Sequence, residues 1–163
     1  IDLNSKLIEI GEARNITNKL GISYEVCSSK QLAATQPKEF DLVVCFELIE
    51  HVQDVEGLLH DCKNLLKSNG LLVVSTINRT MAALLFGIIA AEKILKIVPN
   101  GTHSHDQFIK PNELANLARG VGLLCQDVSG FSYNPFSRQA KFSKSVSINY
   151  FATFLNSNNV SKN

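Results

Sequence analysis

The hydrophobic and polar positions along the chain follow helical and strand-like periods in turn. Residues 1–20 space their apolar side chains roughly as one face of a helix does, and Gly21 follows as a stop signal. The next segment, ISYEVCS at 22–28, alternates apolar and polar residues and predicts a short strand. The run FDLVVCF at 40–46 is almost continuously apolar, which is typical of a strand buried on both faces of a parallel sheet.

The centre of the chain predicts a strand, a helix and a second strand in that order. Asp54 is a suitable N-cap for a helix whose apolar stripe ends at Leu66, and the polar sequence KSNG then closes the helix. The apolar run LLVVSTI at 71–77 predicts the next strand. This order is typical of a parallel pair of strands joined by a helical crossover.

Two further helices are expected after this unit. An apolar segment from about Thr80 to Val98 predicts the first, and the second has Pro111 in its first turn. The most apolar part, MAALLFGIIAA at 81–91, stops at Glu92 and is too short to cross a bilayer. It is therefore either a core helix or an interfacial helix that lies on a membrane or over an apolar substrate.

The end of the chain completes the expected fold. Two extended segments, at 123–136 and 145–154, predict an antiparallel pair at the end of the sheet. The order of helices and strands places the chain in the α/β class, as a single domain over residues 1–163. The tail at 156–163 has almost nothing to bury, and we expect it to be frayed.

Composition narrows the class of protein. The chain has 163 residues, of which 45% are hydrophobic and 19% are charged, and its formal net charge is +1. Its basic residues are scattered without interleaved aromatic residues, which argues against nucleic-acid binding. The four cysteines show no Cys-x-x-Cys spacing, and we expect reduced, buried thiols at Cys27, Cys45, Cys62 and Cys125.

The stretch CFELIEHV at 45–52 places two carboxylates and an imidazole directly after a predicted strand. Open α/β sheets bind ligands beyond the carboxyl ends of their strands. If Glu47 begins a helical turn, Glu47 and Glu50 share a face and His51 lies close to them. This set suits Mg, Mn or Zn, or it uses His51 as a general base held by a carboxylate. The alternative is a plain helix start, where the helix dipole favours acidic residues.

Three other polar residues have two interpretations each. Asp2 either bonds the ribose of a nucleotide, as an acid at the end of a second strand does, or caps the helix that follows it. His103 and His105 could form a metal pair, but their spacing favours a solvated loop. The sequence pattern leaves both questions open.

Four runs in this order and spacing resemble the ubiquinone-biosynthesis O-methyltransferases: FDLVVCFELIEHVQD, LLKSNGLLVVSTINRT, AAEKILKIVPNGTHSHDQFIKP and GFSYNPF. These are class I S-adenosylmethionine-dependent enzymes that methylate polyprenyl catechols. The likeness extends from Ile1 to about Phe154. It implies a Rossmann-like class I methyltransferase sheet, mostly parallel with an antiparallel C-terminal strand pair. It also implies O-methylation of 2-polyprenyl-6-hydroxyphenol and 3-demethylubiquinol.

The resemblance implies roles for five residues by position. Asp2 matches the acid that contacts the ribose of S-adenosylmethionine, and Phe46 matches the hydrophobic contact beside its adenine. Glu47, Glu50 and His51 match the family's proposed magnesium ligands. A Mg²⁺ ion there would orient the catechol and lower the pKa of its hydroxyl. Without a metal, His51 is the first candidate for the catalytic base.

Partners and location also follow from the resemblance. The segment at 80–98 matches a part of the family associated with lipid, which favours peripheral membrane contact. The implied partners are the polyprenyl phenol or quinol substrate and other ubiquinone-biosynthesis proteins, and no nucleic acid. The implied location is the bacterial cytoplasm, peripheral to the inner membrane, with the matrix face of the mitochondrial inner membrane as the alternative.

One part of the family pattern is not found in residues 1–163. The pattern includes a first strand and a GCGGG-type loop, and that strand is central in the class I sheet. We therefore expect an N-terminally truncated sheet with unpaired edges that binds the cofactor poorly on its own. Two alternatives to the enzyme stay open. One is a catalytically inactive fragment that serves as a membrane-associated binding subunit of the quinone-synthesis assembly, and the weaker one is a nicotinamide enzyme.

Overall fold

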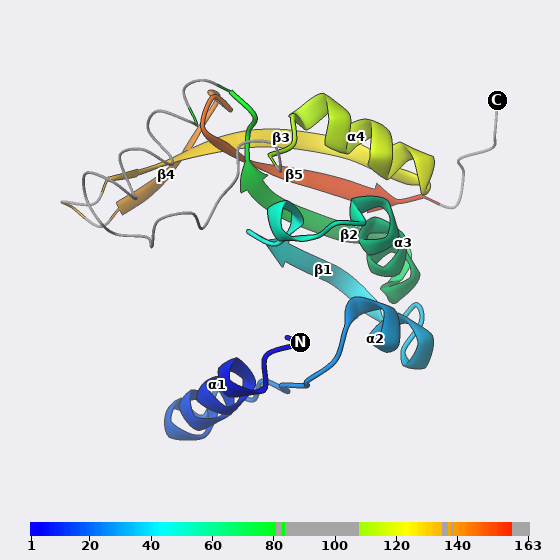
Figure 1. The fold of residues 1–163 in the computed structure, drawn as a ribbon, viewed down its shortest axis with the longest axis vertical. Helices are drawn as coiled ribbons and strands as arrows, with labels where there is room; N and C mark the ends of the chain where they lie inside the picture. Colours follow the sequence, from blue (N-terminus) through cyan, green and yellow to red (C-terminus); the bar gives the residue numbers. More distant parts are fainter. Residues whose placement is uncertain (81–82, 84–107, 135–136, 138, 158–163) are drawn as a thin grey trace.

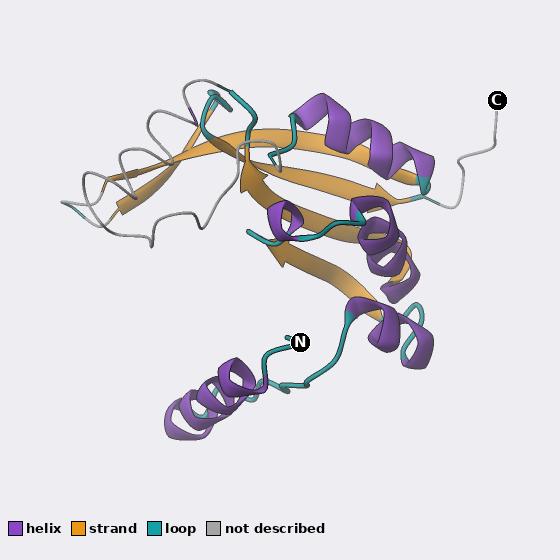
Figure 2. Cartoon of the chain, in the orientation of Figure 1, coloured by secondary structure: helices purple, strands orange, loops and turns teal. Residues whose placement is uncertain are grey.

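The structure is a computed structural model that describes residues 1–80, 83, 108–134, 137 and 139–157. Within these residues the chain forms one curved sheet with helices packed against it (Figure 1). Figure 2 shows helices and strands in the same chain. The predicted α/β class is therefore confirmed.

Five strands form the sheet, in the order β1-β2-β5-β3-β4. Strands β1 and β2 are parallel, whereas the pairs β2–β5, β3–β5 and β3–β4 are antiparallel. The expectation of a mostly parallel sheet is thus wrong for the described residues. The reason is that β5 lies between β2 and β3 and runs antiparallel to both, and β3 and β4, joined by a short connection, form a further antiparallel pair. The bounds are β1 Phe40–Phe46, β2 Leu66–Ile77, β3 Leu123–Asn134, β4 Gln139–Ser143 and β5 Asn149–Asn156.

The parallel pair is connected by α3, Val55–Leu65, as the sequence predicts. Asp54 Oδ1 accepts a hydrogen bond from the backbone N–H of Gly57 at 2.8 Å and so caps the helix. The sequence KSNG does not close the helix, because β2 begins directly at Leu66. The predicted antiparallel pair near the C-terminus is confirmed as β3 and β5.

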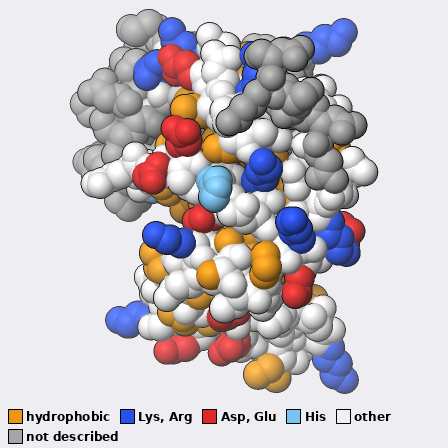
Figure 3. All heavy atoms as spheres, turned by 90° about the vertical axis from the view of Figure 1, so that its right-hand side faces the viewer, with side chains coloured by type: hydrophobic (Ala, Val, Ile, Leu, Met, Phe, Trp, Pro, Cys, Tyr) orange, Lys and Arg blue, Asp and Glu red, His pale blue; other side chains and the backbone are white. Residues whose placement is uncertain are grey.

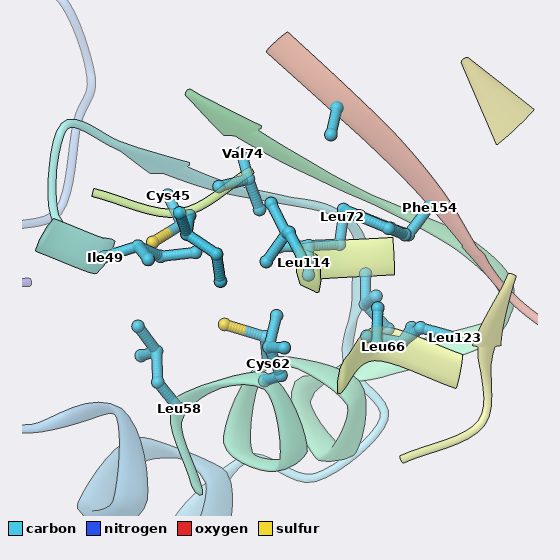
Figure 4. Close-up of a cluster of buried hydrophobic side chains, with 14 of the residues drawn as sticks. Cys45, Ile49, Leu58, Cys62, Leu66, Leu72, Val74, Leu114, Leu123 and Phe154 are labelled. Atoms are coloured by element: carbon cyan, nitrogen blue, oxygen red, sulfur yellow. The ribbon is translucent and has the colours of Figure 1, made fainter. Parts of the chain in front are cut away.

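Helices α3 and α4, Pro111–Gly120, pack against the same face of the sheet, and the core lies between them and the strands (Figure 4). Cys45 of β1 and Cys62 of α3 both lie in this core. Burial raises the pKa of Cys45 to about 11 and that of Cys62 to about 12. All four thiols are free; Cys27, Cys45 and Cys62 are buried as predicted, but Cys125 is exposed.

The opposite face of β1 is open among the described residues. Leu42, Val44 and Phe46 are 53%, 55% and 52% exposed, whereas Val43 and Cys45 of the alternate face pack in the core. Strand β1 also lies at the edge of the sheet. The prediction that this apolar run is buried on both faces is therefore wrong for the part of the chain that the structure describes.

The N-terminal helix α1, Ser5–Asn18, confirms the first predicted helix and lies apart from the sheet (Figure 1). The predicted strand at 22–28 is not formed, since this segment contributes a single parallel bridge between Asp2 and Val26. A strand needs a partner along its length, and the described residues supply one at this point only. Helix α2, Ser29–Thr35, then leads into β1.

Several expectations fall outside the described residues. These are most of the predicted helix at 80–98, together with His103 and His105. Of the predicted frayed tail, Asn156 belongs to β5 and residues 158–163 lie outside the description. Within the described ranges, no helix has both the length and the apolar character that a membrane span requires.

Charged side chains of both signs are mixed on the face of the molecule shown in Figure 3. On the face shown in Figure 3, Lys and Arg side chains are interspersed with Asp and Glu. This distribution agrees with the formal net charge of +1. It gives no strong field of one sign on that face.

Candidate functional site

The acidic loop lies at the carboxyl end of β1, beside the end of β2. Parallel pairing aligns Phe46 with Ser75, and the backbone N–H of Glu47 donates to the carbonyl oxygen of Ser75 at 3.0 Å. The chain then turns through a short 3-10 helix, η1, at Ile49–His51. Because Glu47 precedes this turn, the predicted helical turn that begins at Glu47 is not formed. The two carboxylates nevertheless lie at the rim where α/β sheets bind ligands.

Glu47 occupies an unusual backbone conformation. Its φ is 48°, in the left-handed region that non-glycine residues rarely adopt. Its carboxylate Oε1 accepts a hydrogen bond from Ser75 Oγ at 2.7 Å. Partial desolvation raises the pKa of Glu47, the Ser75 hydrogen bond lowers it, and the nearby Glu50 carboxylate raises it further. Glu47 and Glu50 are therefore close enough to interact through their charges.

Glu50 is the buried member of the pair, at 2% exposure. Its Oε2 accepts a hydrogen bond from Thr76 Oγ1 at 2.8 Å. Its Oε1 is buried and has no hydrogen-bond partner among the described residues. A buried carboxylate oxygen without a donor costs free energy. Glu50 can thus accept one more hydrogen bond.

His51 ends the turn and is exposed to solvent. Its charge lowers the pKa of Glu47, which places the imidazole near that carboxylate. The structure thus brings together the three residues that the sequence singled out after β1.

A second buried polar group lies on β5, where Tyr150 pairs with Thr76 of β2. The Tyr150 hydroxyl donates to the carbonyl oxygen of Ile109 at 3.0 Å, and Tyr150 is fully buried. Burial raises the pKa of Tyr150, and the charges of Glu113 and Glu50 raise it further. Glu113 in turn forms an ion pair with Arg79 Nη2. These contacts join β5 to the segment before α4, and α4 to the segment that follows β2.

The two residues predicted to contact the cofactor lie on different elements. Phe46 has a half-exposed ring in edge-to-face contact with Phe151, with the ring centroids 5.5 Å apart. Asp2 is exposed, and its Oδ1 accepts a hydrogen bond from the backbone N–H of Asn4 at 2.8 Å. Within the described residues Asp2 pairs with Val26 and not with β1. The structure therefore places Phe46 beside the acidic loop, but it does not bring Asp2 to β1.

Glu47, Glu50 and His51 are not arranged as the ligands of a metal ion. In the described part of the chain, no group of three or more His, Cys, Asp and Glu side chains is arranged to hold a metal. One oxygen of Glu47 and one of Glu50 are occupied by the Ser75 and Thr76 hydroxyls. Mg²⁺ requires near-ideal octahedral oxygen geometry. The residues as arranged do not fit magnesium.

The sequence reading missed the two hydroxyls of β2. Ser75 and Thr76 lie inside LLVVSTI, a pattern that predicts a strand and nothing more. The sequence holds no local signal for their role, because Thr is ordinary within a strand and a strand pattern does not show which segment lies beside it. The register that brings them to the loop is visible only in the structure.

The fold and the site together define a class of protein. A parallel strand pair with polar side chains gathered at its carboxyl end is the arrangement in which α/β proteins bind small ligands. A family model described as a methyltransferase domain matches residues 1–128. The chain belongs to this methyltransferase-domain family.

Individual relatives agree with the sequence resemblance. The ubiquinone biosynthesis O-methyltransferase of Xanthomonas euvesicatoria pv. vesicatoria is 41% identical over 152 residues, which cover 93% of this chain and 64% of that protein. The protein of the same name from Colwellia psychrerythraea is 38% identical over 150 residues, covering 92% of this chain and 61% of the relative. The chain therefore spans less than two thirds of the length of these relatives. The family resemblance is confirmed.

Solved structures share the fold. A SAM-dependent methyltransferase from Methanosarcina mazei superimposes with a TM-score of 0.66 at 13% sequence identity. The match covers 96% of this chain and 80% of that protein. At this identity the likeness concerns the fold alone.

Proposed function

We propose that this protein transfers a methyl group from S-adenosylmethionine to a hydroxyl of a polyprenyl catechol in ubiquinone biosynthesis. The proposed acceptors are 2-polyprenyl-6-hydroxyphenol and 3-demethylubiquinol. The observation that carries the proposal is the convergence of Glu47, Glu50 and His51 at the carboxyl ends of β1 and β2. The names of the relatives support the choice of reaction.

The chemistry requires a base beside the acceptor. S-adenosylmethionine supplies a methyl group on a sulfonium; the acceptor oxygen forms an O–C bond as the C–S bond breaks and a thioether leaves. A phenolic hydroxyl is a poor nucleophile while it keeps its proton. His51 is exposed, so it can reach the acceptor, and the Glu47 carboxylate lies close enough for the two charges to interact. We assign His51 as the catalytic base that takes this proton.

The remaining predicted residues bind and orient. The half-exposed ring of Phe46 would contact the adenine of S-adenosylmethionine, and the exposed carboxylate of Asp2 would contact its ribose. Glu47 would orient both the acceptor and the His51 side chain. Holding the reacting oxygen in line with the methyl carbon removes much of the entropic barrier.

Replacing His51 tests the proposal. The His51→Asn variant is expected to lose about 100-fold or more in methyl transfer to a soluble short-chain polyprenyl catechol, the usual scale for a general base. The matched control is His60→Asn, since His60 is exposed on α3 and its ring contacts Asn64. Parallel assays with EDTA and with added Mg²⁺ test the sequence-based prediction that Glu47, Glu50 and His51 bind Mg²⁺.

The outcomes separate the function from the role of one residue. No methyl transfer by the unmodified protein to any catechol would contradict the function and favour the non-catalytic binding subunit. Full activity of the His51→Asn variant would remove the assigned base but leave the function standing. Equal losses in both histidine variants would point to a general effect on folding.

We also propose peripheral membrane contact through about Thr80–Val98. The support is the apolar sequence MAALLFGIIAA at 81–91 and the lipid character of the proposed acceptor. The corresponding location is the bacterial cytoplasm at the inner membrane or, alternatively, the matrix face of the mitochondrial inner membrane, beside other ubiquinone-biosynthesis proteins. Co-sedimentation with anionic phospholipid vesicles tests the contact, and a protein that stays in the supernatant would contradict it.

A further inference from the structure

Two consecutive hydroxyls of β2 hold the two carboxylates of the acidic loop. Ser75 Oγ donates to Glu47 Oε1 at 2.7 Å, and Thr76 Oγ1 donates to Glu50 Oε2 at 2.8 Å. Successive side chains of a strand point to opposite faces of the sheet. The loop is therefore held from both faces, across the end of the parallel pair.

The bond between Thr76 and Glu50 is the buried one. Thr76 is fully buried and Glu50 is 2% exposed. A low local dielectric strengthens a hydrogen bond. Since Glu50 Oε1 receives no hydrogen bond from the described residues, the Thr76 hydroxyl sets the orientation of this carboxylate.

Glu50 anchors the acidic loop at a buried position. It is the central residue of η1, and both it and the preceding Ile49 are buried. The residues that reach solvent, Glu47 and His51, lie on either side of this buried anchor. Fixing Glu50 therefore fixes the two exposed side chains relative to the end of β2.

We propose that Thr76 is a positioning residue: by holding the buried Glu50 carboxylate, its hydroxyl fixes the loop that presents Glu47 and His51 to the methyl acceptor. The identity of the acceptor rests on the proposed function, whereas the placement of His51 does not. A misplacement of about 1 Å at a site can cost on the order of 100-fold in rate, so a loss of about 10- to 100-fold is expected when the hydroxyl is removed.

Three substitutions test this role. Thr76→Val removes the hydroxyl and keeps the shape, and Thr76→Ser keeps the hydroxyl. Thr153→Val is the matched control for the same change on the neighbouring strand β5. The first readout is the NMR resonance of the His51 ring C–H, assigned by its loss in a His51 variant, with the His60 resonance as the internal reference.

The NMR outcome decides the proposal without an activity. The His51 resonance is expected to shift in Thr76→Val, to return in Thr76→Ser and to stay unchanged in Thr153→Val. An unchanged His51 resonance in folded Thr76→Val would overturn the proposal. If the unmodified protein methylates no catechol, the proposed function fails while this readout still stands.

The kinetic outcome separates positioning from stability. For folded enzyme, Thr76→Val is expected to lower kcat/KM about 10- to 100-fold, with recovery in Thr76→Ser. A loss of stability with unchanged kcat/KM would mean a purely structural hydroxyl and would also overturn the proposal. Should Thr76→Val not fold, the double variant Thr76→Val with Glu50→Leu removes both polar partners, which proteins tolerate better than one. The same His51 shift is expected there, and its absence counts against the proposal.

Discussion

At Glu47 the backbone adopts a left-handed conformation, with φ 48°. For a residue other than glycine this conformation costs roughly 1–2 kcal/mol. The strain turns the chain directly after β1, so that the Glu47 carboxylate meets Ser75 at the end of β2. Such strain is typical of functional sites, where surrounding contacts hold it in place.

Replacing Glu47 with glycine should separate stability from activity. Glu47→Gly relieves the left-handed strain, and we expect the free energy of unfolding to rise by up to about 1 kcal/mol. Methyl transfer should fall because the carboxylate beside His51 is lost. Lys38→Gly is the matched control, because Lys38 also has a positive φ, of 59°, away from the acidic loop. Chemical denaturation and methyl-transfer assays of both variants check this, and unchanged activity in Glu47→Gly would contradict it.

The residues of the candidate site were only partly accessible from sequence. Glu47, Glu50 and His51 could be found because charged residues directly after an apolar strand need an explanation. Thr76 could not be found, because a β-branched residue is ordinary within a strand. What gives Thr76 its role is the register of β1 on β2, and a register is a property of two segments together.

Helix α3 illustrates what local patterns determine. Its N-cap, Asp54, was predicted from the sequence and accepts the Gly57 N–H at 2.8 Å. Its C-terminal boundary was misplaced, because the polar residues of KSNG look like a helix stop although they extend β2. A side-chain cap is a local interaction, whereas the pairing of Leu66 with Phe40 is a long-range one.

Asp54 and Gly57 are predicted to be coupled. Asp54→Ala should lower the free energy of unfolding by about 1 kcal/mol through loss of the N-cap. A Cβ at position 57 would collide with the Asp54 carboxylate, so Gly57→Ala should bring little gain in the unmodified protein. In the Asp54→Ala background the same change should recover about 1 kcal/mol of helix propensity. A double-mutant cycle by chemical denaturation measures the coupling, and strict additivity of the two changes would contradict it.

Other elements show why a pattern can mislead. The segment at 22–28 alternates as a strand does but makes a single bridge to Asp2. The run at 40–46 is apolar on both faces, yet one face of β1 is open among the described residues. Both patterns report what the residues favour, while strand pairing and burial depend on which neighbours are present.

At the scale of the whole molecule, the sheet has one covered face and one largely open face at β1. Helices α3 and α4 pack on the covered face (Figure 1). On the other, Leu42, Val44 and Phe46 form an apolar row on an edge strand. An exposed apolar edge strand is a site of self-association, because its backbone can pair with another chain.

Residues 1–163 alone are therefore expected to self-associate, and a charge on the open face should reduce this association. Val44→Lys puts a charge in the middle of the apolar row, and at an exposed position the free energy of unfolding should change by no more than about 0.5 kcal/mol. Val43→Lys is the matched control: it lies one residue away but packs against the core, so the fold should lose more than about 2 kcal/mol. Sedimentation velocity over a range of concentrations measures the association. If the unmodified chain is monomeric at tens of micromolar, the predicted self-association does not occur. If the Val44→Lys variant associates as strongly as the unmodified chain, the open face of β1 does not drive the association.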